Sequence, residues 1–112
     1  MKKELLICGR KEDCKILVDK FDSMYNFNIT TINSYGTYPN LHQLRRQVKN
    51  CDILLIDVED FSAITFSVIS FALAYDLDIV GYHKDIRDRL SQTLLNACDS
   101  VGYVDDLEEY FG

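Results

Sequence analysis

Residues 50–82 form the most strongly apolar stretch of the chain, and short polar breaks divide it into three segments. Residues 53–58 are nearly all apolar, which is typical of a parallel strand that is buried on both faces. Residues 61–75 are apolar almost all round, as in a helix that is buried on more than one side. Residues 79–82 form the next apolar run, so the stretch predicts strand, helix, strand with a right-handed crossover. We therefore expect residues 53–58 to form an interior strand, flanked by the first strand and by residues 79–82.

The rest of the chain repeats this alternation of short apolar runs and helical spacing. The β-branched residues and mixed polarity of residues 27–32 favour an edge strand. The further predicted strands are residues 4–8, 27–32 and 101–104, and the further predicted helices are residues 14–24, 41–48, 85–97 and 105–111. This order predicts an α/β fold, namely a flavodoxin-like three-layer sandwich with a five-stranded parallel sheet, as a single domain over residues 1–112.

Composition narrows the class of protein. A chain of 112 residues with 47% hydrophobic residues can bury one core. Its net charge of −6 argues against binding to duplex DNA, which needs a basic surface. The sequence contains no apolar run of about 18 residues, the length needed to span a membrane, and its first residues do not form a signal peptide. We therefore expect no membrane contact and a location in the cytoplasm.

The four cysteines, Cys8, Cys14, Cys51 and Cys98, are scattered, without the close pairs that zinc sites use. Three of them lie beside apolar runs, which favours reduced thiols in the core. We predict no metal site and no cofactor.

Polar residues at the predicted strand ends are the candidates for chemistry, because open α/β sheets bind ligands there. Gly9 and Arg10 follow the first strand, where backbone N–H groups at the start of a helix could hold a phosphate, although a plain tight turn is equally consistent. Asp57 and Glu59 end the central strand and are the candidate catalytic acids. Ser62 is either a ligand contact or a helix N-cap.

Asp57 ends a central strand, as the phosphoacceptor of a response-regulator receiver domain does. Receivers carry an acidic pair for magnesium after the first strand, whereas this chain has Cys8, Gly9 and Arg10 there. We therefore give this interpretation, which rests on fold analogy, less weight than a second resemblance.

The segments ICGRKED, NCDILLIDVEDFSAITFSVISFALAYDLDIVGY, RLSQTLLNACD and DDLEEYF resemble, in order and spacing, the nucleoside 2-deoxyribosyltransferase family. The resemblance is closest to its 2′-deoxynucleoside 5′-phosphate N-hydrolase branch. It implies a nucleotide ligand, contacts from Gly9, Ser62 and Ser91, and a homodimer in which neighbouring subunits complete each pocket. The nearly all-apolar helix over residues 61–75 also suggests a second copy over its outer face.

The chain departs from that family at the positions that carry its chemistry. Val68 stands where the family has its glutamate nucleophile, and Ser70 stands at a family glycine. Leu44 and Leu6 replace a second carboxylate and an aromatic residue. Because valine cannot attack a sugar, the resemblance implies a protein without turnover. The aliphatic replacements also predict that the cleft is packed and closed.

Three functional hypotheses follow. The first is a catalytically degenerate member of this family that binds a nucleotide-like ligand without turnover, so that the chain is not an enzyme. The second is an acidic protein–protein interaction or inhibitor module on the same fold. The third is an active nucleotide N-glycosidase in which Asp57 or Glu59 acts as a relocated carboxylate.

Overall fold

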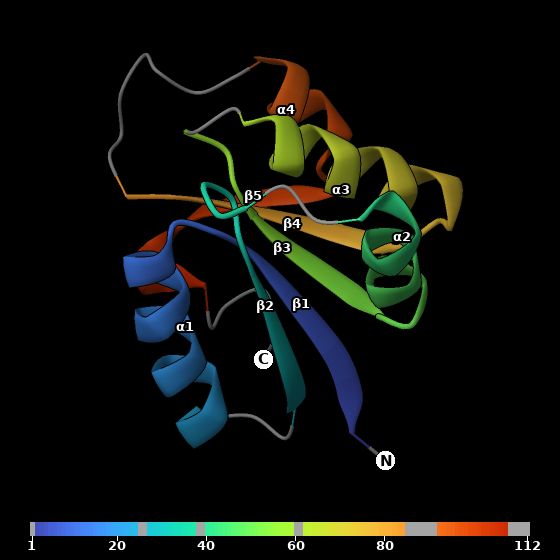
Figure 1. Ribbon diagram of the computed structural model, residues 1–112. Helices are drawn as coiled ribbons and strands as arrows, with labels where there is room; N and C mark the ends of the chain where they lie inside the picture. Colours follow the sequence, from blue (N-terminus) through green and yellow to red (C-terminus); the bar gives the residue numbers. More distant parts are fainter. Residues whose placement is uncertain (1, 25–26, 38–39, 60–61, 85–91, 108–112) are drawn as a thin grey trace.

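The structure is a computed structural model, and it describes residues 2–24, 27–37, 40–59, 62–84 and 92–107. Its centre is a five-stranded parallel sheet in the order β2-β1-β3-β4-β5 (Figure 1). The strands are β1 Lys3–Gly9, β2 Phe27–Asn33, β3 Ile53–Asp57, β4 Asp78–His83 and β5 Ser100–Tyr103. The predicted fold class, a flavodoxin-like α/β sandwich, is confirmed.

Strand β3 lies in the interior of the sheet, as its apolar run predicts. Leu5 of β1 pairs with Ile53 on one side, and Ile79 of β4 pairs with Leu54 on the other. All residues of β3 are buried, because helices cover both faces of the sheet. The predicted edge position of β2 is also confirmed.

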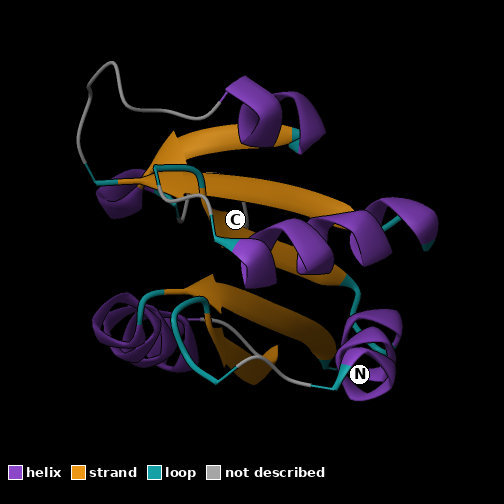
Figure 2. Cartoon of the chain, turned by 45° about the horizontal axis from the view of Figure 1, so that its top comes forward, coloured by secondary structure: helices purple, strands orange, loops and turns teal. Residues whose placement is uncertain are grey.

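Helices cover the two faces of the sheet unequally. Helix α1 (Lys11–Met24) packs on one face, and helices α2 (Leu41–Lys49), α3 (Ala63–Ala74) and α4 (Gln92–Ala97) pack on the other (Figure 2). These elements therefore form the three layers of the sandwich.

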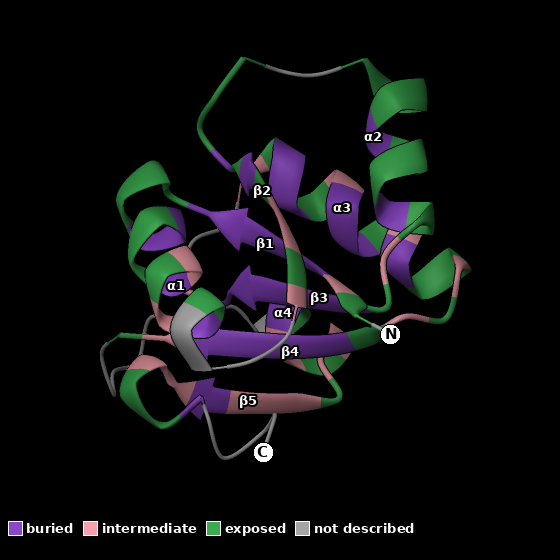
Figure 3. Ribbon diagram, turned by 90° about the horizontal axis from the view of Figure 1, so that it is seen from below, coloured by how far each residue is buried: buried purple, intermediate pink, exposed green. Residues whose placement is uncertain are grey.

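Alternation along the strands divides the core between these two faces. Leu5 and Ile7 of β1 face α1, whereas Leu6 and Cys8 face the other helices, because successive strand side chains point to opposite sides. Figure 3 shows β1, β3 and β4 buried between the helical layers. Fully buried helix residues complete the two clusters: Leu17 and Phe21 on the α1 side, and Leu44, Val48, Val68 and Ala72 on the other.

Helix α3 has a defined start and end. The Ser62 side chain accepts a hydrogen bond from the Thr65 backbone N–H at 3.1 Å, so Ser62 is the N-cap. The helix ends at Ala74 with Tyr75 as its C-cap, and Asp76, with φ 57°, turns the chain toward β4. A left-handed backbone of this kind is unusual for a residue other than glycine, and Asp is one of the types that tolerate it.

The C-terminal part is only partly described. Of the predicted helix over residues 85–97, the structure describes Gln92–Ala97, and residues 85–91 lie outside the described residues. The predicted terminal helix over residues 105–111 begins as a short 3-10 turn, Val104–Asp106, and residues 108–112 lie outside the described part. None of the helices described is both long enough and apolar enough to cross a membrane.

Candidate functional site

The candidate site lies where β1, β3 and β4 end, on the α1 side of the sheet. Gly9 and Asp57 continue the rows of side chains that face α1, and Asp57 pairs with Tyr82 across β3 and β4. Lys84 follows β4, and Asp13 comes from the first turn of α1. The alternation of strand side chains therefore brings Gly9, Asp57, Tyr82 and Lys84 to the carboxyl end of the strands, and α1 adds Asp13.

Asp57 is held in place at the end of β3. Its side chain is buried, and its Oδ1 accepts a hydrogen bond from the Glu59 backbone N–H at 2.9 Å. A carboxylate that accepts from the backbone two residues later stabilises a turn. Its Cβ lies 3.8 Å from the point where a β-carbon on residue 9 would stand, so Asp57 faces Gly9 across the strand ends.

The phenol of Tyr82 fills the space between these strand ends. Tyr82 is fully buried, and its hydroxyl lies so close to Gly9 that a β-carbon there would overlap it. Among the described residues the hydroxyl has no hydrogen-bond partner. Burial, and then the nearby charges of Asp57 and Asp13, raise the pKa of Tyr82 far above its usual range. The phenol therefore stays protonated.

An ion pair closes the outer side of the site. The ammonium group of Lys84 donates to Asp13 Oδ1 at 2.9 Å, with Asp13 buried and Lys84 half exposed. This hydrogen bond raises the pKa of Lys84. The Lys84 backbone N–H donates to the carboxylate of Glu59. Lys84 thus ties together α1, β4 and the segment after β3, while the second oxygen of Asp13 has no partner within the part of the chain that the structure describes.

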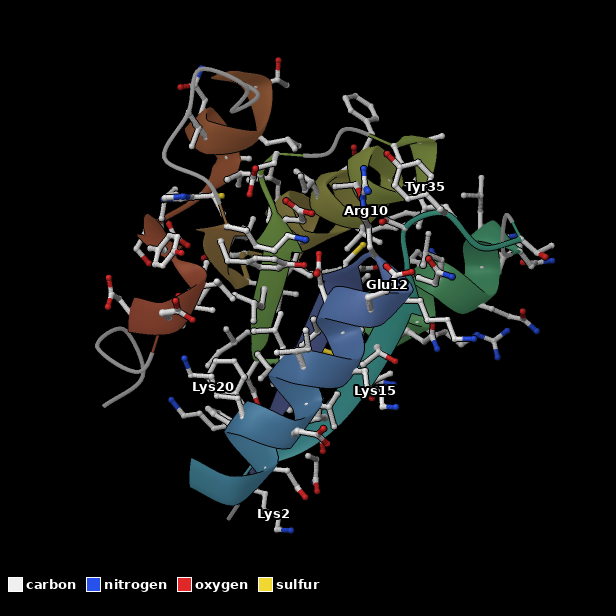
Figure 4. All side chains as sticks on the ribbon, turned by 90° about the vertical axis from the view of Figure 1, so that its left-hand side faces the viewer. Lys2, Arg10, Glu12, Lys15, Lys20 and Tyr35 are labelled. Atoms are coloured by element: carbon white, nitrogen blue, oxygen red, sulfur yellow. The ribbon has the colours of Figure 1, made fainter. Side chains whose placement is uncertain are left out.

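Arg10 points away from this cluster toward the loop after β2. Its guanidinium lies over the ring of Tyr35, 5.4 Å from the centroid (Figure 4), at the distance of a cation–π contact. The Ser34 backbone N–H donates to the Gly9 carbonyl at 2.9 Å. A depression of about 450 Å³ lies beside this contact; it is lined by Arg10, Lys11, Glu12, Asn33 and Tyr35.

The structure separates the candidate ligand-binding and catalytic residues that were predicted from the sequence. Gly9 and Asp57 lie together, Arg10 stacks on Tyr35, and Ser62 caps α3. Glu59 holds the backbone of Lys84. Ser91 lies outside the described residues.

Sequence reasoning missed Asp13, Tyr82 and Lys84. Tyr82 and Lys84 lie at or just beyond the end of the predicted strand over residues 79–82, which was the available signal for them.

The positions that should carry glycosidic chemistry are core positions. Leu6, Leu44 and Val68 are all fully buried in the same hydrophobic cluster. The prediction that this cleft is packed is therefore confirmed, and these positions offer no polar group to a ligand.

The cysteines have raised pKa values. All four are free thiols, and burial raises the pKa of Cys8 to about 12 and those of Cys14, Cys51 and Cys98 to about 11. At neutral pH such groups are thiols and not the nucleophilic thiolate. Within the described part of the chain, no cluster of three His, Cys, Asp or Glu side chains could hold a metal ion.

Comparisons with known proteins identify the fold. No protein-family model matches the sequence, and no curated protein matches it significantly. A signal receiver domain of a modulated diguanylate cyclase from Desulfovibrio desulfuricans has a TM-score of 0.70 at 14% identity, over 99% of this chain and 91% of that one. The receiver domain of a sensor histidine kinase from Pseudomonas aeruginosa, with magnesium in its active-site cleft, gives 0.68 at 12% identity, over 98% and 94%. A chain from the complex of the P1 domain of CheA3 with CheY6, from R. sphaeroides, has a TM-score of 0.63 at 15% identity, over 97% of this chain and 91% of that one.

These neighbours overturn the predicted family. The similar structures are mostly receiver domains, and no family model and no sequence homologue supports a nucleoside 2-deoxyribosyltransferase. The predicted nucleotide binding without turnover was therefore wrong, and neither the inhibitor module nor the relocated N-glycosidase is supported. The error has a physical cause. An apolar strand that ends in a glycine or an aspartate, as at Gly9 and Asp57, is common to many doubly wound sheets and does not identify one family.

Proposed function

We propose that the chain is a receiver-like signalling domain that acts by contact with a protein partner, without magnesium-dependent phosphorylation of Asp57. Its likeness to receiver domains over nearly the whole chain supports the class. The complex of CheY6 with a domain of CheA3 is an example of a neighbour that binds a protein. Location in the cytoplasm and pairing with a second copy stay predictions.

The observation that carries the proposal is that protein side chains fill the carboxyl end of the strands around Asp57. Phosphoryl transfer depends on positioning the acceptor and on stabilising the transferred charge. Here one oxygen of Asp57 is held by the Glu59 N–H, and the ammonium of Lys84 is held by Asp13. The Tyr82 phenol occupies the space beside Gly9. A phosphoryl group on Asp57 would have to displace this protein contact.

The first strand gives further support. Receiver domains use an acidic pair after this strand to hold magnesium, and here the strand ends in Cys8 and Gly9, followed by Arg10. Cys8 is fully buried, and Arg10 lies over Tyr35. Residues 8–10 therefore carry no carboxylate for a metal ion, and Asp13, in the first turn of α1, is paired with the ammonium of Lys84.

The contact between Arg10 and Tyr35 is a suitable centre for a partner surface. Tyr35 is 57% exposed at the same end of the sheet as Asp57, and its backbone is fixed by a hydrogen bond to the Asn33 side chain at 3.0 Å. Arginine and tyrosine are among the residue types that contribute most to binding energy in protein interfaces.

The test is site-specific photocrosslinking in the source cells. A benzoylphenylalanine at position 35 keeps the aromatic ring, and the same residue at position 16 of α1, where Ile16 is 61% exposed, is the matched control. We expect one discrete protein adduct from position 35 and none from position 16, unchanged by Asp57→Asn. No adduct from position 35, or an adduct that Asp57→Asn abolishes, would contradict the proposal.

A further inference from the structure

Helix α3 carries no charged residue, although the chain as a whole is 27% charged. At that density a helix of 12 residues would hold about three charges. The neighbouring helix α4 is also uncharged between Gln92 and Ala97. Helix α3 also exposes large apolar side chains, since Phe66 is 50% and Leu73 57% exposed. Its outer face therefore differs from an ordinary solvated surface.

The exposed positions of α3 lie on one face of the helix. Ala63, Phe66, Ser70, Leu73 and Ala74 are exposed, and their spacing of three and four residues places them side by side. The face therefore has one large apolar side chain toward each end and the small Ser70 between them.

The serine hydroxyls of α3 are satisfied within the helix. Ser67 donates to the Ala63 carbonyl at 3.0 Å, and Ser70 donates to the Phe66 carbonyl at 2.9 Å. A hydroxyl that already donates to the preceding turn leaves no donor unpaired when water is removed. The outer face of α3 can therefore be buried without losing a hydrogen bond that its hydroxyls donate.

We propose that α3 is the centre of a two-fold interface between two copies of this chain. In an antiparallel pair about an axis near Ser70, Phe66 of each copy lies opposite Leu73 of the other. Such an arrangement is isologous, with the same patch used twice. The proposal rests on this surface alone and does not depend on the proposed signalling function.

The charge distribution selects a second copy as the occupant. Each copy has a net charge of −6, so two copies repel each other on the whole. The uncharged face of α3 is a place where two copies meet without opposing like charges. It also offers no charge to recognise a basic or acidic partner.

Helix α3 alone is too short to form the whole interface of a stable dimer. A stable interface buries about 800 Å² on each partner, whereas a helix of 12 residues is only about 18 Å long. Helices α2 and α4 lie on either side of α3 (Figure 1), and α4 exposes the uncharged Thr93 and Asn96. We therefore place α4 at the edge of the interface.

The experiment is sedimentation velocity over the micromolar range on the wild type, on Phe66→Lys and on Leu73→Glu. We expect a reversible dimer for the wild type and at least tenfold weaker association for each variant alone. An equimolar mixture of the two variants should form a one-to-one dimer, since the lysine introduced in one copy then faces the glutamate introduced in the other. Ile16→Lys, at an exposed apolar position on the opposite layer, should associate like the wild type.

A wild type that stays monomeric throughout, or an Ile16→Lys variant that dissociates as strongly as Phe66→Lys, would overturn the proposal. So would a mixture that fails to associate while both variants keep native circular dichroism. If either variant unfolds, Ser70→Cys decides, because residues near the axis should form an intermolecular disulfide with oxidised glutathione. Failure of Ser70→Cys to crosslink more than Ile16→Cys would also overturn it.

Discussion

The hydroxyl of Tyr82 occupies the space that a β-carbon on Gly9 would need. Tyr82 lies near the end of β4 and Gly9 ends β1, so the phenol reaches across the end of β3, where Asp57 lies. The phenol therefore fills the carboxyl end of these strands. It also couples the effects on stability of substitutions at positions 9 and 82.

We predict strong coupling between Gly9→Ala and Tyr82→Phe. Gly9→Ala forces a methyl group against the Tyr82 hydroxyl and should destabilise the fold by about 1–3 kcal/mol, the usual cost of overpacking. In a Tyr82→Phe background the oxygen is gone and most of this cost should disappear. The measurement is a double-mutant cycle from urea unfolding.

Gly81→Ala is the control for this cycle. Its β-carbon would lie 2.6 Å from Val58 Cγ1 and 2.9 Å from Cys98 Sγ, so it should also destabilise the fold. Because it does not meet the Tyr82 hydroxyl, its cost should be the same with Phe or Tyr at position 82. Equal costs of Gly9→Ala in both backgrounds would show that Tyr82 does not fill this space.

Alkaline titration should distinguish Tyr82 from the other tyrosines. Since the folded-state pKa of Tyr82 is raised by burial, its contribution to stability is complete below the unfolded pKa of about 10 and is lost as the pH rises above that value. The native protein should show no tyrosinate absorbance from Tyr82. Tyr82→Phe should leave the native titration unchanged, remove one tyrosine from the unfolded titration and lessen alkaline destabilisation. A smaller native titration in Tyr82→Phe would contradict this.

Lys84→Met should leave Asp13 buried without its cation. We expect a loss of about 2 kcal/mol, between the values of about 0–1 for exposed pairs and about 3–5 for buried ones, because Lys84 is half exposed. Asp13→Asn combined with Lys84→Met should recover part of the loss. The raised pKa of Lys84 means that the pair contributes fully below the unfolded pKa of about 10.4 and less as the pH rises through the folded value. Thermal melts from neutral to alkaline pH measure both effects, and equal melts of Lys84→Met and wild type at neutral pH would argue against the pair.

Val68→Glu should destabilise the fold by several kcal/mol at neutral pH, because Val68 is fully buried among aliphatic side chains and an unpaired carboxylate there is costly. Mild acid should reduce the loss, since protonation removes the charge. Val68→Gln, similar in shape but uncharged, should be destabilised without this pH dependence. Urea midpoints at both pH values provide the measurement, and an unchanged midpoint for Val68→Glu would mean that the cleft is open.

The sheet could be predicted because its strands carry their own signals. The apolar run of residues 53–58 and the mixed polarity of residues 27–32 correctly predict an interior and an edge strand. Helix α1 begins at Lys11, earlier than the apolar spacing from residue 14 suggests, because its first turn is polar and carries acids that suit a helix N-terminus.

The site could be predicted only in part. Asp57 was identified because it ends a strand, whereas the ion pair of Asp13 and Lys84 joins residues 71 positions apart. Its partners have no local pattern, so only the folded arrangement brings them together. The family resemblance failed for the same reason. The sequence segments that carry it show where strands end, but not which side chains come together at those ends in the folded protein.

We propose that protein groups already fill the site around Asp57, so that phosphorylation does not switch this domain. The most direct measurement is the two-dimensional amide NMR spectrum before and after adding magnesium and beryllium fluoride, which together mimic a phosphoryl group on a carboxylate. We predict that the amide resonances of Gly9, Glu59 and Lys84 do not shift. Shifts at these three residues that are absent in Asp57→Asn would contradict the claim and identify Asp57 as a phosphoacceptor.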